Sequence, residues 1–148
     1  MAGSESENQL DTSSIDDVIG YRLRRAQLAV FTRFAARFAA NDLKPAEYSA
    51  LTLIADNPGR KQAEIAEALA IKRANFVALA EGLARRGLLE RRRSQGDRRA
   101  HALFLTTEGE KLVGYIRRIQ QEFEADLVER LGGETARNSL VALLKRLG

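Results

Sequence analysis

The chain contains no cysteine, no tryptophan and a single histidine among its 148 residues. The absence of cysteine excludes disulfides, thiol redox switching and zinc sites built on thiolates. One histidine excludes metal motifs that need a histidine pair, and neither a P-loop nor a G-x-S-x-G nucleophile motif occurs. The sequence therefore argues against an enzyme, and no cofactor or metal is expected.

Long apolar runs and a basic leader are also missing. A membrane helix needs about 20 consecutive apolar residues, and no such stretch occurs. Residues 1–17 carry five carboxylates and no lysine or arginine, whereas a signal peptide begins with a basic segment. We therefore expect a cytoplasmic protein without a membrane partner. The Ser/Glu/Asn-rich residues 1–13 are expected to form a disordered acidic tail.

Basic charge, in contrast, is concentrated in one segment. The formal net charge of the chain is +4, but residues 85–99 contain seven arginines against two carboxylates. Such a cluster is typical of a surface that binds a polyanion. The alternative is an ordinary solvated charged face.

Apolar periodicity predicts a mainly α-helical chain. The first helix is expected from Ile15, with Ser13 or Ser14 as its N-cap, because apolar residues recur there in steps of three and four. Further helices are expected at about 45–56, 62–70, 72–87, 107–131 and 134–148. The fifth helix is capped by Thr106, or by Thr107 in a capping box with Glu110.

The third and fourth predicted helices are joined by a short turn and form a helix-turn-helix. Directly after them, residues 88–92 and 100–105 are expected to form two short strands around the turn Ser94-Gln95-Gly96-Asp97. A helix-turn-helix followed by a two-stranded hairpin is a winged helix. The arginine cluster then lies on this hairpin, the wing, where binding to phosphates releases counterions and relieves the repulsion among the arginines.

The wing carries a signature that other proteins share. It consists of Asp97-Arg98-Arg99, Leu105-Thr106 and Gly109, and it matches the D-x-R…L-T-x-x-G pattern of MarR-type regulators. The chain also resembles that family in Leu83, in Gly87-Leu88, in the order of its elements and in its length. The resemblance implies a homodimeric winged-helix transcription factor, usually a repressor. Such proteins bind pseudo-palindromic double-stranded DNA and commonly release it on binding a small molecule, often a phenol or an aromatic acid.

The expected organisation is a single domain over residues 14–148. Its DNA-binding lobe is placed at about 42–106, and its dimerisation helices at about 14–40 and 107–148. The leucine and phenylalanine stripes of the terminal helices exceed what a small winged helix needs to cover its own core. A second copy is the simplest partner for them, and packing within one chain is the alternative.

Two groups of residues are candidates for reading DNA sequence. Arg99 matches the family arginine that enters the minor groove from the wing tip, and Asp97 matches the carboxylate that orients it through a bidentate pair. On the fourth helix, Asn75 suits adenine, and Arg73 or Lys72 suits guanine. The alternatives are a stiffening ion pair in the wing, phosphate contacts for the two cations, and an N-cap role for Asn75.

The remaining DNA candidates are less specific. Gln62 is expected to contact a phosphate or to cap the third helix. Arg91 and Arg93 are expected to bind phosphate, with a carboxylate of the domain as the alternative partner. Ala78 and Val77 stand where many relatives carry an arginine and a serine or threonine, so Ala78 is expected to contact a thymine methyl group. The complete candidate set is Gln62, Lys72, Arg73, Asn75, Ala78, Arg91, Arg93, Asp97, Arg98 and Arg99.

A second site is implied only by the resemblance, which places effectors where the dimerisation helices meet the DNA-binding lobe. The candidates are Tyr21, Arg25, Phe34, Phe38 and Tyr48. Arginine beside aromatic faces suits an aromatic carboxylate or its coenzyme A thioester. Alternatively, the phenylalanines are plain core and the arginines are solvated. The alternative function for the whole chain is a winged-helix protein-interaction module without specific DNA binding.

Overall fold

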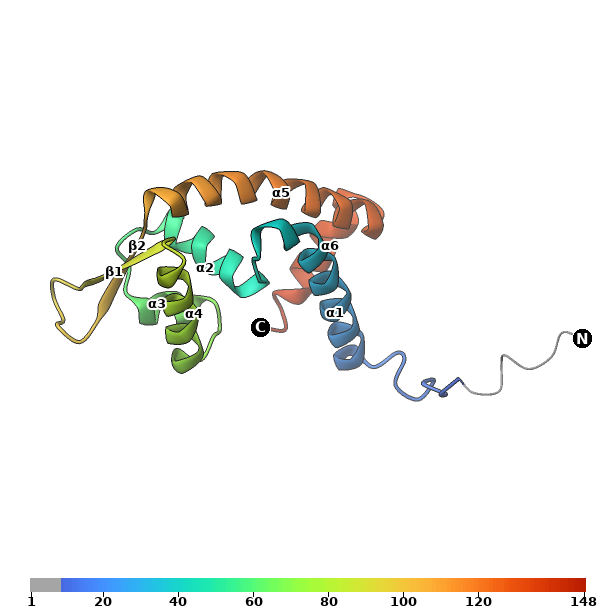
Figure 1. Ribbon diagram of the computed structural model, residues 1–148. Helices are drawn as coiled ribbons and strands as arrows, with labels where there is room; N and C mark the ends of the chain where they lie inside the picture. Colours follow the sequence, from blue (N-terminus) through green and yellow to red (C-terminus); the bar gives the residue numbers. More distant parts are fainter. Residues whose placement is uncertain (1–8) are drawn as a thin grey trace, which may run out of the picture. The chain divides into compact units, whose positions relative to one another are not determined.

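The computed structural model describes residues 9–148, so the first eight residues of the expected acidic tail lie outside the described residues. The elements follow in the order α1 (Ile19–Phe38), η1 (Ala39–Asn41), α2 (Pro45–Asp56), α3 (Gln62–Ala68), α4 (Arg73–Arg85), β1 (Leu89–Arg93), β2 (His101–Leu105), α5 (Thr107–Leu131) and α6 (Glu134–Leu144). The two strands pair antiparallel and project beside α3 and α4 (Figure 1). The expected mainly α-helical class with a hairpin wing is confirmed.

The chain forms two compact units that meet in the sequence between Arg33 and Phe34. The N-terminal unit contains most of α1 and the turn before it. The second unit contains everything from Phe34 onwards, including the whole winged helix. Among residues 9–148, no helix combines the length and the apolar character that crossing a membrane requires.

The start of the first helix differs from the sequence prediction. α1 begins at Ile19 rather than at Ile15, because the preceding residues form a turn. In that turn the Thr12 carbonyl accepts a hydrogen bond from the Ile15 N–H at 3.0 Å. The Asp11 carboxylate accepts another from the Ser13 N–H at 3.0 Å, and this bond lowers the pKa of Asp11. The local turn competes with the helix for the same backbone groups, so the expected serine cap is wrong.

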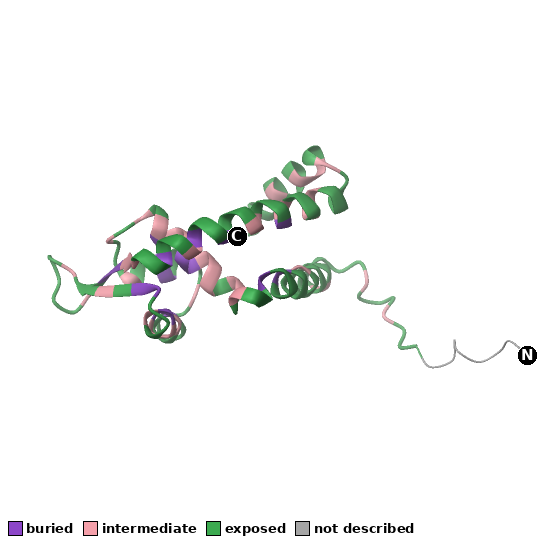
Figure 2. Ribbon diagram, turned by 45° about the horizontal axis from the view of Figure 1, so that its top comes forward, coloured by how far each residue is buried: buried purple, intermediate pink, exposed green. Residues whose placement is uncertain are grey.

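The core of the second unit lies where α2, α5 and the base of the hairpin meet, as the buried stretches in Figure 2 show. Its largest fully buried side chains are Phe38, Leu51, Ile54, Phe76, Leu83, Leu103 and Ile116. The N-terminal unit instead exposes Ile15, Val18, Ile19, Leu23, Leu28 and Phe31. The winged helix therefore has a core of its own, whereas the apolar side chains of the N-terminal unit stay accessible.

Candidate nucleic-acid interface

Helix α4 presents an accessible surface at its N-terminal end. Its inner side buries Phe76, Ala80 and Leu83. The exposed residues of its first turns are Lys72, Arg73, Ala74, Asn75, Val77 and Ala78. Helical geometry places Ala78 opposite the buried side and puts Arg73 and Val77, four residues apart, on one flank. The side chains predicted to contact bases are thus all exposed at the same end of α4.

The structure removes the capping alternative for two of the candidates. The N-cap of α4 is Lys72, so Asn75 lies within the first turn and does not cap the helix. The N-cap of α3 is Lys61, whose N–H donates to Glu64 at 2.9 Å. Gln62 therefore does not cap α3, and its Oε1 is buried without a hydrogen-bond partner in residues 9–148.

The tip of the wing is closed by backbone hydrogen bonds and one carboxylate. The Ser94 N–H donates to the Ala100 carbonyl at 2.9 Å, and the Ala100 N–H donates to the Asp97 carbonyl at 3.0 Å. Asp97 Oδ1 accepts from the backbone N–H of Arg99 at 3.0 Å. The expected bidentate pair with the Arg99 guanidinium is therefore replaced by an Asx-type turn. This turn fixes the backbone direction at Arg99. The contact with Asp97 is made by the backbone of Arg99 and not by its guanidinium.

One face of the wing is occupied by an internal stack. Nε and Nη2 of Arg92 donate to the two carboxylate oxygens of Glu90, each at 3.0 Å. The Arg92 guanidinium also lies 4.2 Å from the ring centroid of Phe104 on the opposite strand. Hydrogen bonding and charge in this pair lower the pKa of Glu90 and raise that of Arg92. Arg92 thus stiffens the hairpin of the wing, and the carboxylate of Glu90 balances its charge.

Arg91 takes the carboxylate partner that the sequence left as an alternative. Its Nη1 lies 3.8 Å from Glu81 Oε1 on α4, and its side chain is only 28% exposed. This contact fastens β1 to α4. The exposed arginines of the wing are Arg92, Arg93, Arg98 and Arg99, and the last three are the wing's candidates for contact with DNA.

The contacts at the base of the wing explain the L-T-x-x-G signature. The Thr106 hydroxyl donates to the Gly87 carbonyl at 2.6 Å and accepts from the Gly109 N–H at 3.0 Å. Thr106 is therefore the cap of α5, and the alternative capping box of Thr107 with Glu110 is wrong. A Cβ at Gly109 would overlap the carbonyl oxygen of Leu88, so only glycine fits there. The motif thus joins the end of α4, the wing and α5.

Comparison with known proteins identifies the family. Residues 41–100 match the MarR family model. A protein of Thauera aromatica assigned to the regulation of the hcr operon is 33% identical over 140 residues, which cover 94% of this chain and 84% of that protein. The chain belongs to the MarR family.

Solved structures of a MarR-type repressor resemble most of the chain. CouR bound to a 23-mer DNA duplex is 39% identical with a TM-score of 0.86, and the match covers 94% of this chain and 98% of CouR. CouR bound to p-coumaroyl-CoA is 38% identical with a TM-score of 0.86, and covers 94% and 97%. The MarR-family chain is accordingly a winged-helix transcriptional regulator and not an enzyme.

The effector candidates of this MarR-family protein are split between the two compact units. Phe34, Phe38 and Tyr48 lie together in the second unit, with ring centroids 4.1 Å apart for the two phenylalanines and 5.7 Å and 5.8 Å from these to the tyrosine. Phe123 of α5 completes the cluster at 5.8 Å from Phe34. Phe34 and Phe38 are 5% and 0% exposed, which favours the core alternative for them, whereas Tyr48 is half-buried.

The other two candidates, Tyr21 and Arg25, lie on α1 in the N-terminal unit. Within that unit Arg25 lies on an open, shallow face of α1. The same face of α1 carries Leu28, Ala29, Thr32 and Arg33. Two arginines beside an apolar side chain form a surface suited to an anion that carries an apolar group.

Proposed function

We propose that this protein is a homodimeric repressor that binds a pseudo-palindromic operator and releases it when an aromatic acid, or its coenzyme A thioester, binds. The observation that carries DNA binding is the exposure of the α4 N-terminus beside a wing with Arg93, Arg98 and Arg99 exposed. The 39% identity to CouR, which has been solved on a DNA duplex, supports it. The known relatives include bacterial proteins, so operator binding would place the protein in the cytoplasm.

The proposed docking assigns α4 and the wing to the DNA grooves that each of them fits. Helix α4 enters the major groove, where Arg73 and Asn75 meet base edges and Ala78 meets a thymine methyl group. Arg99 enters the narrow minor groove beside it, where the negative potential is strongest. Arg93, Arg98 and Lys72 bind phosphates. The DNA-binding lobe is then about 42–106.

The proposed dimer is supported by apolar side chains that one copy leaves accessible. Helix α6 and its C-terminal extension expose Leu140, Leu143, Leu144 and Leu147, and the N-terminal unit exposes a further set. These segments belong to the proposed dimerisation regions, about 14–40 and 107–148. A second copy related by a twofold axis would cover them and place the two α4 helices about 34–36 Å apart, one turn of DNA.

The proposed effector class rests on charge and on one relative. CouR, 38% identical, has been solved with p-coumaroyl-CoA, a thioester that combines a phenol with several phosphates. Within the N-terminal unit, Arg25 and Arg33 of α1 suit phosphates, and Tyr21 on the same helix suits the aromatic end. Release of DNA requires that the effector bind the released state more tightly than the DNA-bound state.

The deciding experiment compares binding of the wild type and Arg99→Ala to DNA from the promoter region of the chain's own gene, across a salt series. We expect the wild type to select one palindromic site with a steep salt dependence, and Arg99→Ala to lose most of that selectivity. Arg118→Ala, which removes the same charge from exposed α5, is the control and should keep it. Weak, sequence-blind binding that ignores Arg99 would favour the protein-interaction module instead.

A further inference from the structure

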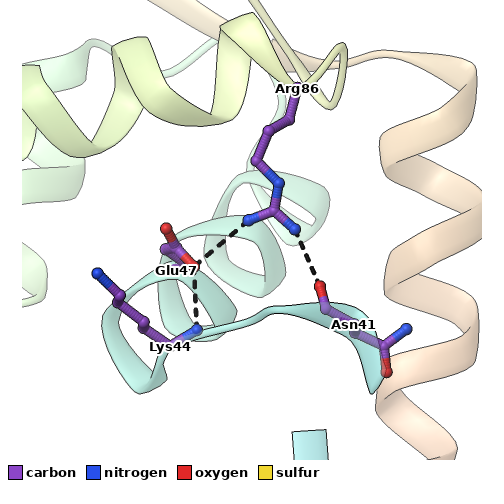
Figure 3. A network of polar contacts seen from close by, with 4 residues as sticks. All are labelled: Asn41, Lys44, Glu47 and Arg86. Carbon is purple, nitrogen blue, oxygen red and sulfur yellow. Dashed lines mark hydrogen bonds and ion pairs between the residues drawn. The ribbon is translucent and has the colours of Figure 1, made fainter. Parts of the chain in front are cut away.

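Arg86 joins the C-terminal end of α4 to the start of α2. Its Nη2 donates to the carbonyl oxygen of Asn41 at 3.0 Å, and its Nη1 lies 3.5 Å from Glu47 Oε2 (Figure 3). The same Glu47 oxygen accepts the N–H of Lys44 at 2.9 Å and so caps α2. One guanidinium therefore contacts both the chain before α2 and the carboxylate that begins it.

This contact is a partly exposed ion pair that is joined by a hydrogen bond to the backbone. The side chains of Arg86 and Glu47 are 33% and 19% exposed, so water screens them less than it screens exposed pairs. Arg86 is also the C-cap of α4 and is followed by Gly87 at φ +72°. Its positive charge at the C-terminal end of the helix complements the helix dipole. The last turn of α4 is thus fixed both in direction and in position.

The inner side of α4 packs through apolar side chains, and Glu81 of α4 pairs with Arg91 of β1. Phe76, Ala80 and Leu83 pack without directional bonds, and such packing tolerates small rotations of a helix. The 13 residues of α4 make a rod about 20 Å long. A rotation of about 10° at its C-terminal end would move its N-terminal end by about 3 Å, which exceeds the tolerance of a hydrogen bond to a base.

We propose that Arg86 is a positioning residue for operator recognition. By holding the C-terminal end of α4 on Asn41 and Glu47, it sets where Arg73 and Asn75 stand at the other end of the helix. The proposal rests on the proposed DNA-binding function and adds that Arg86 acts through protein contacts. The competing role for an arginine at this place is direct phosphate binding.

The two roles predict opposite signs for Glu47→Gln. If Arg86 binds phosphate, removal of the Glu47 charge releases the guanidinium and strengthens binding to any DNA. If Arg86 is a positioning residue, the same substitution weakens binding to the operator and leaves non-specific binding unchanged. Glutamine at position 47 can still accept the Lys44 N–H, so the cap of α2 is kept.

The experiment measures affinity for the selected operator and for an unrelated duplex, with the thermal midpoint of each variant. The variants are Arg86→Gln, Glu47→Gln, their double mutant and Arg86→Lys, with Arg85→Gln as the control that removes a neighbouring charge. We expect Arg86→Gln and Glu47→Gln each to lose on the order of tenfold in operator affinity, as loss of a charged hydrogen bond would give. Unrelated DNA and the salt slope should be unchanged, and the double mutant should be no worse than either single mutant. Arg86→Lys should recover part of the loss, and Arg85→Gln should keep the operator preference.

Equal losses on both duplexes for Arg86→Gln, or tighter binding by Glu47→Gln, would overturn the positioning role. A wild type without operator preference would overturn the proposed function as well, so the two failures are distinguishable. A second readout needs no DNA. Backbone amide shifts of Arg73 and Asn75 in the free protein should move in Glu47→Gln and stay in place in Arg85→Gln.

Discussion

At the scale of single residues, the wing separates charges that hold it together from charges that are available to a partner. Arg92 is engaged by Glu90 and Phe104, and Arg91 is engaged by Glu81. Arg93 and Arg99 are exposed at the end of β1 and in the turn. A cluster that looks uniform in the sequence therefore consists of structural and accessible arginines, and only the second kind should govern binding to DNA.

The Glu90–Arg92 pair gives a titration that can be followed directly. The pKa of Glu90 is held below its ordinary value by the hydrogen bonds and charge of Arg92, so Arg92→Gln should raise it. Carboxyl NMR resonances, followed with acid, would report the change. Because the folded-state pKa is depressed, any stability from the pair is present above the unfolded pKa and is lost as the pH falls through the folded pKa. An unchanged Glu90 titration in Arg92→Gln would contradict the contact.

Gly109 is the residue where an added methyl group should be costly. A Cβ there overlaps the carbonyl oxygen of Leu88, so Gly109→Ala should lower the free energy of unfolding by about 3 kcal/mol, the scale of overpacking. The control is Gly114→Ala on the same helix, where nothing lies within 4 Å of an added Cβ. It should stabilise the protein by roughly 0.5–1 kcal/mol, since alanine is the better helix former. Urea unfolding of both variants makes the comparison, and equal effects would rule out the overlap.

At the scale of elements, the helices are coupled through their ends. Thr106 caps α5 and also donates to Gly87 at the end of α4, while Arg86 ties that same end to α2. The C-terminal end of α4 is consequently held from both sides. The exposed N-terminal end, which carries the base-contact candidates, takes its position from there.

Thr106→Val tests this coupling because valine keeps the shape of threonine and removes the hydroxyl. It should destabilise the protein by about 1–2 kcal/mol through loss of the cap and of the bond to Gly87. Thr107→Val, one residue later and exposed, should change stability little. Equilibrium unfolding in urea separates the two, and a similar loss in both variants would refute the special role of Thr106.

Most elements could be predicted because apolar periodicity reflects burial, which decides where helices and strands lie. The start of α1 could not, since the Asp11 turn is local hydrogen bonding that periodicity does not detect. The partner of Asp97 could not either, because a carboxylate can accept equally well from a backbone N–H or a guanidinium. The neighbours Phe34 and Phe123, and the bond of Arg86 to the Asn41 carbonyl, depend on tertiary packing. A carbonyl has no residue-specific trace in the sequence.

At the scale of the whole molecule, one copy leaves a large apolar surface accessible. Leu143 and Leu147 near the C-terminus are 56% and 64% exposed. Exposure of this extent marks an interface, because contiguous apolar patches are rare on monomeric proteins. The proposed twofold dimer would give that surface a partner and supply the second recognition helix.

The proposed dimer can be tested by placing negative charges on the exposed apolar side chains near the C-terminus. The double variant Leu143→Glu with Leu147→Glu should sediment as a monomer and lose on the order of 100-fold or more in operator affinity, since each half-site is then bound alone. The control is Tyr115→Ser, which removes an exposed aromatic from α5 and should leave the dimer intact. A double variant that still sediments as a dimer would place the interface elsewhere.

The close approach of Gly109 to Leu88 also bears on how descendants of this chain can diverge. Positions 73, 75, 77 and 78 of α4 are exposed and can change through successive gene copies without disturbing the core. Position 109 admits no such drift, because every larger residue collides with the chain itself. Lineages that come to read different operators should therefore differ at the exposed positions of α4 and share this glycine. The joint of α4, the wing and α5 then stays the same while the DNA sequence that is recognised changes.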